Sequence, residues 1–179
     1  MILSLDISTS CTGYCVFDED DLIAIGHISL SKHKDFYEKA NRIKSELREI
    51  NKKYNIHYVA VEENLQAFRP GLSSAKTLMT LAQFNGTVRW ICSEIFNLKP
   101  VAINVNTARK SIGLKIDKKD KSKTTKEKVL EWVSVDNPAI VWPTKILKSG
   151  PNKGQQRVCG EAYDMADAYV IGRSFIIEK

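Results

Sequence analysis

The sequence contains no apolar stretch long enough to cross a membrane as a helix. Its first six residues, M-I-L-S-L-D, are apolar up to Asp6, but they have no basic flank and no cleavage-type site. This start therefore predicts a first strand rather than a signal peptide. The chain of 179 residues also has no internal repeat and no linker that would divide it. We expect one soluble, cytoplasmic domain that spans residues 1–179.

Cysteine and histidine are scarce, with four and three residues respectively. The cysteines include no C-x-x-C pair and the histidines are scattered, which argues against a zinc site. Reduced thiols in a cytoplasmic protein are the simpler interpretation. A P-loop is missing as well, because S-G-P-N-K-G-Q (149–155) has neither G-K-[ST] nor the required spacing.

Acidic residues are outnumbered most strongly in one segment. Residues 109–128 hold nine Lys or Arg against three acids, an excess equal to the whole net charge of +6. A second basic stretch contains Lys145, Lys148, Lys153 and Arg157, with no acid between it and Glu161. Charge runs are often only solvated loops, but concentration on few segments is typical of a surface that binds a polyanion. We therefore expect nucleic acid as the partner.

Hydrophobic periodicity indicates three early strands followed by alternating helices and strands. Strands are predicted at residues 1–6, 14–17, 22–30, 57–62 and 100–105, and helices at about 33–53, 73–97 and 124–134 and from 161 onward. The first three strands suggest an antiparallel meander, and the run H-Y-V-A-V-E has the character of a central strand. This order predicts an α/β domain with a mixed sheet.

The last predicted helix carries two carboxylates into an apolar stretch. From Met165 to Gly172 every side chain is apolar, aromatic or absent except that of Asp167, and Asp164 lies one helical turn earlier. A helix that is apolar all round is usually buried, and a buried carboxylate is costly unless it is paired or bound to a cation. The pair therefore suggests a site for a hard divalent cation.

Further carboxylates stand where strands end. Asp6 ends the first strand, and Glu62 and Glu63 end the fourth. Asp6 could instead cap a turn, and the two Glu could be ordinary solvated residues. Ligand sites in open α/β sheets, however, lie beyond the carboxyl ends of strands. Carboxylates from three separated segments fit a two-metal phosphodiester nuclease.

Three motifs resemble one family. They are L-D-I-S-T-S-C-T-G-Y-C-V-F (5–17), V-A-V-E-E-N-L-Q-A-F (59–68) and D-M-A-D-A-Y-V-I-G (164–172). They are similar to motifs of the RuvC-type Holliday junction resolvases of the ribonuclease H-like superfamily. The resemblance implies a ribonuclease H-like mixed five-stranded sheet, with three antiparallel strands and then parallel ones, flanked by helices.

The resemblance also implies roles for individual residues. The metal ligands and catalytic carboxylates would be Asp6, Glu62, Asp164 and Asp167, with Glu63 as the alternative to Glu62. Lys123 would be a catalytic cation, and Arg109 or Lys110 a further basic residue of the site. Phe68 is the nearest match to a Phe that contacts bases at the crossover, although a core position is the alternative. The resemblance thus implies Phe68, Arg109, Lys110 and Lys123 as DNA-binding residues, and the charge of the basic segment adds Lys118, Lys119 and Lys121.

The implied activity is Mg²⁺-dependent cleavage of four-way DNA junctions by paired nicks, with Mn²⁺ able to substitute. Two opposed cuts imply a homodimer, and the predicted helix 73–97 offers Met79, Phe84, Gly86 and Trp90 for its interface. The stretch 135–160 is longer than the usual connection and is similar to versions carried by phages and mobile elements.

Three other classes of protein remain as alternatives. A flap or fork endonuclease would use the same carboxylates. An actin-like phosphotransferase shares the look of the first motif, but the chain is too short for its two domains and lacks a glycine-rich adenosine-binding stretch. A catalytically inactive DNA-binding module is disfavoured because all four carboxylates are present.

Overall fold

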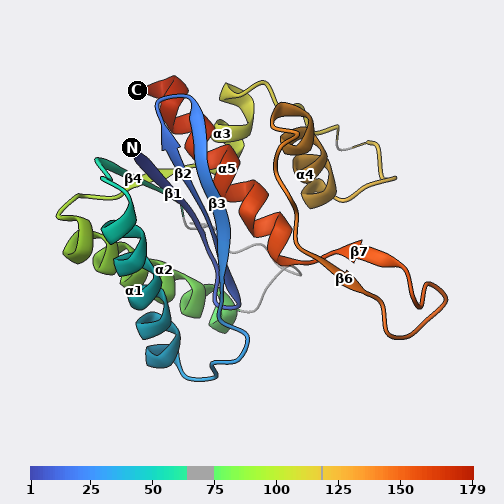
Figure 1. Cartoon of the computed structure of the whole chain (residues 1–179), viewed down its shortest axis with the longest axis horizontal. Helices are drawn as coiled ribbons and strands as arrows, with labels where there is room; N and C mark the ends of the chain where they lie inside the picture. The colour runs from blue at the N-terminus through green and yellow to red at the C-terminus, as the bar shows by residue number, and fades with distance from the viewer. Residues whose placement is uncertain (64–74, 118) are drawn as a thin grey trace.

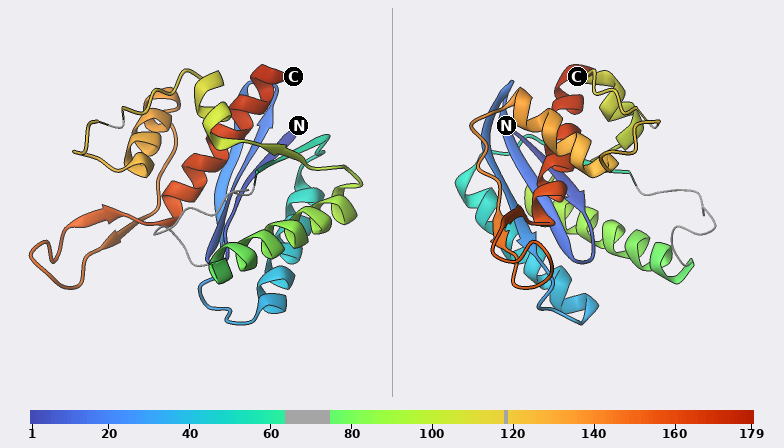
Figure 2. Two further views of the ribbon diagram at one scale, coloured as in Figure 1. Left: turned by 180° about the vertical axis from the view of Figure 1, so that it is seen from behind. Right: turned by 90° about the vertical axis from the view of Figure 1, so that its right-hand side faces the viewer.

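The structure, a computed structural model, describes residues 1–63, 75–117 and 119–179, which form three layers with helices on both faces of a sheet (Figure 1, Figure 2). The sheet has the order β3-β2-β1-β4-β5 and consists of β1 (Ile2–Ile7), β2 (Cys11–Asp18), β3 (Asp21–Ser29), β4 (Tyr58–Glu62) and β5 (Val101–Ile103). β1, β2 and β3 pair antiparallel, whereas β4 pairs parallel with both β1 and β5. The expected mixed five-stranded α/β fold is confirmed.

The helices divide between the two faces of this sheet. α1 (Phe36–Lys53) and α2 (Ala75–Phe96) pack on one face, and the other carries α3 (Val105–Ser111), α4 (Thr125–Asp136) and α5 (Glu161–Glu178). In Figure 2 the two helical layers lie on opposite sides of the strands. None of the helices in the described ranges combines the length and apolarity needed to cross a membrane.

Local sequence explains where the predicted helices begin and which side they bury. Asp35 caps α1 by accepting from the backbone N–H groups of Tyr37 and Glu38, and the inward positions of α1 recur with helical spacing, at Ala40, Ile43, Leu47 and Ile50. Thr124 and Glu127 form a capping box at the start of α4. Both helices follow the predicted positions closely.

The alternation of side chains along the central strand separates two cores. Leu3, Leu5 and Ile7 belong to the core beneath α1 and α2. Ile2 belongs to the core beneath α5, and the Ser4 hydroxyl donates to the Ala168 carbonyl of α5 over 2.8 Å. Because successive side chains of a strand point to opposite faces, Asp6 shares the α5 face with Ile2 and Ser4.

Two glycines let α5 lie close to this face of the sheet. A Cβ at Gly13, on β2, would overlap the backbone carbonyl of Asp164, and one at Gly172, on α5, would overlap the ring of Phe17. Gly13 is also the β2 partner of Asp6. The absence of a side chain at Gly13 therefore sets how near the first turn of α5 comes to Asp6.

The structure contains three short elements, one helix and two strands, that periodicity did not predict. The strand expected at 100–105 ends at Ile103, and Asn104 then caps α3 by accepting from the backbone N–H groups of Asn106 and Thr107. The stretch 135–160 contains an antiparallel pair, β6 (Thr144–Ile146) and β7 (Gln156–Val158), which forms a separate two-stranded sheet. Each of these elements is too short to show a clear period.

Gly13→Ala should lower the free energy of unfolding by roughly 1–3 kcal/mol, because the new methyl group meets backbone that belongs to α5 and cannot rotate away. Gly86→Ala, on α2, is the matched control, since no atom in the described part of the chain lies within 4 Å of its added Cβ. In a helix that change should raise stability by about 0.5–1 kcal/mol. Urea denaturation of both variants measures the difference, and equal stability of the two would contradict the close packing of α5.

Candidate active site

The two strand-end carboxylates reach the same face of the sheet through side-chain alternation. On β4, Val59 and Val61 belong to the core under α1 and α2, whereas Ala60 belongs to the core under α5. Glu62 therefore faces α5, as Asp6 does on the neighbouring parallel strand. Asp6 is 7% exposed, and its carboxyl group is hydrogen-bonded to that of Glu62.

Glu63 follows Glu62 directly, so its side chain points away from α5, and it has a different neighbour. The Asn104 side-chain amide donates to a Glu63 carboxylate oxygen over 3.2 Å, and the Glu63 backbone N–H donates to the Ile103 carbonyl. Glu63 therefore lies with the end of β5. Of the two adjacent glutamates, Glu62 is the one that the structure brings to Asp6.

The first two turns of α5 supply the other two carboxylates. Asp167 is 7% exposed, and the side chain of Asp164 is also largely buried. The Cys11 thiol, on β2, donates to the Asp164 carboxylate. Asp164 also lies in the first turn of the helix, where the exposed backbone N–H groups favour a negative charge.

The electrostatics show that these four carboxylates converge. Burial raises the pKa of Asp6 well above its usual value, and the hydrogen bond to Glu62 and the charges of Glu62, Asp167 and Asp164 raise it further. Burial also raises the pKa of Asp164, and the charge of Lys126 and the thiol of Cys11 only partly offset this effect. The cluster is therefore a region of strong negative potential in a poorly hydrated place.

Two cations from the basic segment lie against the cluster. Arg109, on α3, donates from Nη2 to an Asp167 carboxylate oxygen over 3.0 Å, and Lys126, on α4, approaches an Asp164 oxygen at 3.4 Å. Burial acts to lower the pKa of Lys126, but the charges of Asp164, Asp167 and Asp6 outweigh it, so the pKa is raised. The Arg109 Nε is buried and has no hydrogen-bond partner among the described residues. These contacts explain how α5 tolerates a carboxylate in its apolar stretch.

The donor set has the chemistry that a hard divalent cation requires. Carboxylate oxygens are the preferred ligands of Mg²⁺ and Mn²⁺, and a cation would relieve the repulsion that raises the pKa of Asp6. As the side chains stand, no three acidic, Cys or His residues within the described ranges form a ready-made metal cage. Arg109 and Lys126 hold Asp167 and Asp164 instead. The four carboxylates therefore fit a divalent metal ion when Asp167 and Asp164 exchange their ion pairs for coordination of the metal.

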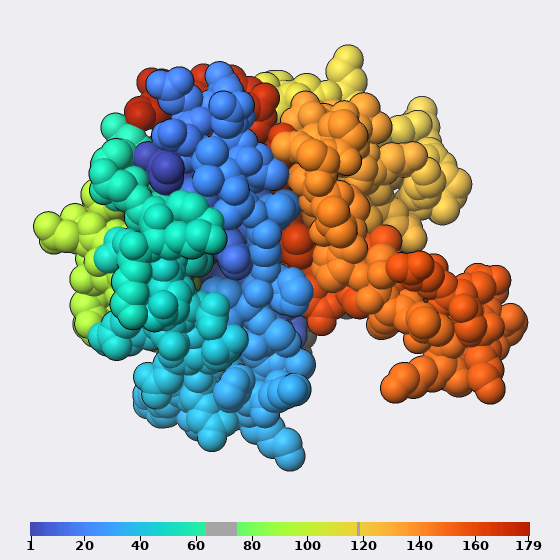
Figure 3. Space-filling model, viewed as in Figure 1, coloured from blue at the N-terminus to red at the C-terminus, as the bar shows by residue number. Residues whose placement is uncertain are grey.

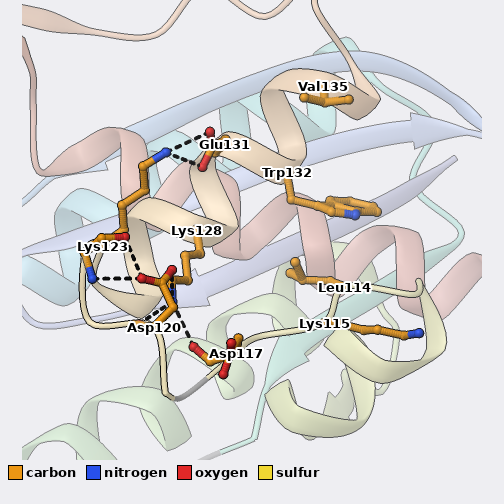
Figure 4. Close-up of a pocket in the computed structure, with 10 residues that line it drawn as sticks. Leu114, Lys115, Asp117, Asp120, Lys123, Lys128, Glu131, Trp132 and Val135 are labelled. Carbon is orange, nitrogen blue, oxygen red and sulfur yellow. Dashed lines mark hydrogen bonds and ion pairs between the residues drawn. The ribbon is translucent and has the colours of Figure 1, made fainter.

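Lys123 lies elsewhere, on the outer side of α4. Its ammonium group donates to both carboxylate oxygens of Glu131, at 2.7 and 2.8 Å. It lines a surface pocket of about 420 Å³ that includes Trp132 and Lys128 but none of the four carboxylates (Figure 4). The structure does not bring Lys123, expected from the sequence as a catalytic cation, to the four carboxylates, and Lys126 is the lysine that lies beside them.

The remaining predicted DNA-binding residues fall into three groups. Arg109 and Lys110 line a second pocket of about 400 Å³ between α3 and the start of α4. Lys119 and Lys121 are exposed in the connection before α4. Phe68 and Lys118 lie outside the described residues.

Sequence reasoning missed Lys126, Cys11 and Asn85. The Asn85 side chain, buried on α2, donates to the Glu62 backbone carbonyl over 3.2 Å and so helps to hold the end of β4. Lys126 was one of nine similar charges in its segment, so its sequence position carried no separate signal. A buried Asn within an apolar helix was the one available sign for Asn85.

Solved structures share this fold. "T. thermophilus RuvC in complex with Holliday junction substrate" matches with a TM-score of 0.66 and 15% identity over 98% of this chain and 92% of that chain. "Thermus thermophilus RuvC structure" matches with a TM-score of 0.59 and 15% identity over 98% and 93%. The yeast mitochondrial Holliday junction resolvase Ydc2 matches with a TM-score of 0.55 and 13% identity over 98% and 77%. The chain therefore has the RuvC-like, ribonuclease H-like fold.

The sequence also matches the model of one protein family. Residues 1–140 match the family described as Lactococcus phage M3 protein. The match extends over most of the chain, so the chain belongs to that family. No curated protein sequence matches it.

Asp6→Asn should stabilise the metal-free protein at neutral pH but not in acid. The pKa of Asp6 is raised in the folded state, so its ionisation at neutral pH lowers the free energy of unfolding, whereas an amide cannot ionise. In EDTA near pH 7 the variant should gain about 1 kcal/mol. This gain should vanish as the pH falls through the folded-state pKa towards the unfolded-state value. Urea denaturation across this pH range measures it.

Glu63→Gln is the isosteric control and should show no such gain, because Glu63 lies beside Asn104. Mn²⁺ should then raise the unfolding temperature of the wild-type protein more than that of Asp6→Asn. An equal response of these two proteins would remove Asp6 from the metal site.

Proposed function

We propose that this chain is a divalent-metal-dependent endodeoxyribonuclease that resolves four-way DNA junctions by paired, symmetric nicks, and that residues 1–179 act as one RuvC-like nuclease domain. The observation that carries the proposal is the convergence of Asp6, Glu62, Asp164 and Asp167 from β1, β4 and α5 on one face of the sheet. The likeness of the fold to RuvC structures supports the same reaction class.

The four carboxylates are the proposed ligands for Mg²⁺, with Mn²⁺ able to substitute. When bound, the cations would activate the attacking water and stabilise the leaving oxygen of the phosphodiester. Arg109 and Lys126 neutralise Asp167 and Asp164 in the protein alone. If metal took these carboxylates, the side chains of Arg109 and Lys126 would be free to stabilise charge on the scissile phosphate. Lys126 is therefore our candidate for the catalytic lysine.

Branched double-stranded DNA is the proposed partner, because the excess positive charge lies next to the carboxylates. The segment 109–128 holds the equivalent of the whole net charge, and it includes both Arg109 and Lys126. Lys119 and Lys121 are exposed in this segment and belong to the proposed phosphate-binding surface. Such contacts supply affinity without sequence preference.

Two opposed cuts require two active sites, so we propose a homodimer through α2. Met79 and Trp90 are each 63% exposed on this helix, and Gly86 has open space beside it. Positions 79, 86 and 90 share one face of a helix, and methionine and aromatic residues are enriched at interfaces. Phe84 does not belong to this surface, because it is fully buried against the sheet.

Glu62→Gln should abolish cleavage of a labelled four-way junction while leaving DNA binding intact, and Glu63→Gln should retain activity. Asp6→Asn, Asp164→Asn and Asp167→Asn should behave as Glu62→Gln does, because metal ligands carry the chemistry whereas basic residues carry affinity. We expect losses of about a hundredfold or more in the single-turnover rate with Mg²⁺.

Two lysines provide the matched comparison in the same assay. Lys126→Ala should lower the single-turnover rate at saturating enzyme by about tenfold or more, whereas Lys123→Ala should leave it unchanged, since Lys123 pairs with Glu131. Near wild-type cleavage by any carboxylate variant would exclude that residue as a ligand. A slow Lys123→Ala would instead restore Lys123 as the catalytic cation.

A supercoiled plasmid with an extruded cruciform should yield linear product directly, because a dimer makes both cuts within one encounter. Sedimentation of the free protein should show a species of about 40 kDa, twice the chain mass of 20.2 kDa, at micromolar concentration. Two outcomes would contradict the resolvase proposal but not the proposed metal site: nicked circles that accumulate first, and faster cutting of flaps and forks than of four-way junctions. The protein would then be a flap or fork endonuclease.

A further inference from the structure

The pair of strands β6 and β7 forms an arm that extends away from the rest of the molecule. We call residues 143–159 the basic arm. Backbone hydrogen bonds between its two sides continue beyond the strands. The Cys159 N–H donates to the Pro143 carbonyl at the base, and the Leu147 N–H donates to the Gln155 carbonyl near the tip. Gly150 and Gly154, both with positive φ, form the turn. Figure 1 and Figure 3 show the arm projecting to the right of the body.

The basic arm contributes nothing to either hydrophobic core in the described part of the chain. Both strands are largely exposed, and even the apolar side chain of Ile146 is 67% exposed. Trp142 anchors the base by donating to the Ser134 hydroxyl of α4 over 2.9 Å. A two-stranded hairpin is at best marginally stable in water. Its presence therefore needs an explanation other than packing within this chain.

The arm carries only positive charge, and two of its cations are placed directly opposite each other. Lys145 pairs with Arg157 across the strands. Like charges at such a position destabilise a hairpin. Among the described residues, Lys145, Lys148, Lys153 and Arg157 make no ion pair. The pKa of Glu127 is lowered first by its hydrogen bonds with Thr124 and then by the charge of Arg157, which therefore lies near it. An anionic partner would remove the repulsion between the cations.

The basic arm also joins the chain at the proposed active site. β7 ends at Val158, and α5 begins at Glu161, so that Asp164 follows the arm within one helical turn. The four residue steps from Cys159 to Gln155 span about 13 Å. That length matches about four base pairs of duplex, at about 3.4 Å each. The arm therefore lies within reach of a duplex whose scissile phosphate is at the carboxylates.

We propose that the basic arm binds the phosphate backbone of the duplex next to the cleaved strand, with Lys145 and Arg157 as its main contacts. A two-stranded β-ribbon fits the major groove of DNA, and phosphate contacts orient a protein on the duplex without reading its sequence. The proposal rests on the proposed function for its location. The expected chemistry, a cationic β-ribbon that binds a polyanion, follows from the exposure and the positive charge of the arm alone.

The test measures binding of the full-length protein to a four-way junction in EDTA, where no cutting occurs, across a range of salt concentrations. Lys145→Ala/Arg157→Ala should weaken binding about tenfold and reduce the slope of log affinity against log salt by about two, one for each phosphate that these side chains no longer neutralise. Arg48→Ala/Lys52→Ala, on α1, removes the same charge from the opposite layer and should leave the slope unchanged. Hydroxyl-radical footprinting should show that the arm variant no longer protects about four base pairs on one duplex arm.

Lys145→Glu separates a binding role from a structural one. It turns the like-charge pair into an ion pair with Arg157, so the unfolding temperature should stay the same or rise while DNA binding falls. An unchanged salt slope in the double variant, or wild-type binding by Lys145→Glu, would overturn the arm proposal and leave the nuclease proposal standing. If the double variant shows a reduced salt slope but the wild-type protein cuts no DNA with Mg²⁺, the arm proposal is supported and the proposed catalysis is refuted.

Discussion

The close approach of α5 to β1 and β2 is the contact on which the candidate site depends. Gly13 admits the backbone of Asp164, and the Ser4 hydroxyl holds the Ala168 carbonyl one turn beyond Asp164. Two of the four carboxylates lie on this helix and the other two on the sheet beneath it. The separation of helix and sheet therefore decides whether the carboxylates act as one cluster, and a single methyl group on β2 would change it.

The cluster is held together at an electrostatic cost. Burial and mutual repulsion raise the pKa of Asp6, which means that the folded protein tolerates its charge poorly. Arg109 and Lys126 reduce the cost at Asp167 and Asp164 from α3 and α4, the two helices that pack against α5. The same two cations would be released towards a phosphate if metal took their place. The basic segment thus stabilises the carboxylates in the folded protein, and in the proposed reaction it would also offer positive charge to the substrate.

Sequence patterns predicted the elements whose side chains repeat over several turns or strand positions. The apolar spacing of α1, the short apolar run of β1 and the uniform apolar character of α5 were all sufficient for this. They could not predict α3, a helix of seven residues, or the three-residue strands of the basic arm. The choice between Glu62 and Glu63 also required the structure, because it depends on which face Ala60 and Val61 take, and either register is compatible with an apolar run.

The sequence by itself determined the fold class and the positions of the acidic residues at strand ends and on the last helix, because these follow from local periodicity. Only the tertiary structure decided which charges meet. Arg109 pairs with Asp167 across 58 positions of the chain, and Lys126 with Asp164 across 38. No local pattern distinguishes these two cations from the seven other basic residues of their segment. Their partners depend on how α3 and α4 pack against α5, which is a long-range property of the folded chain.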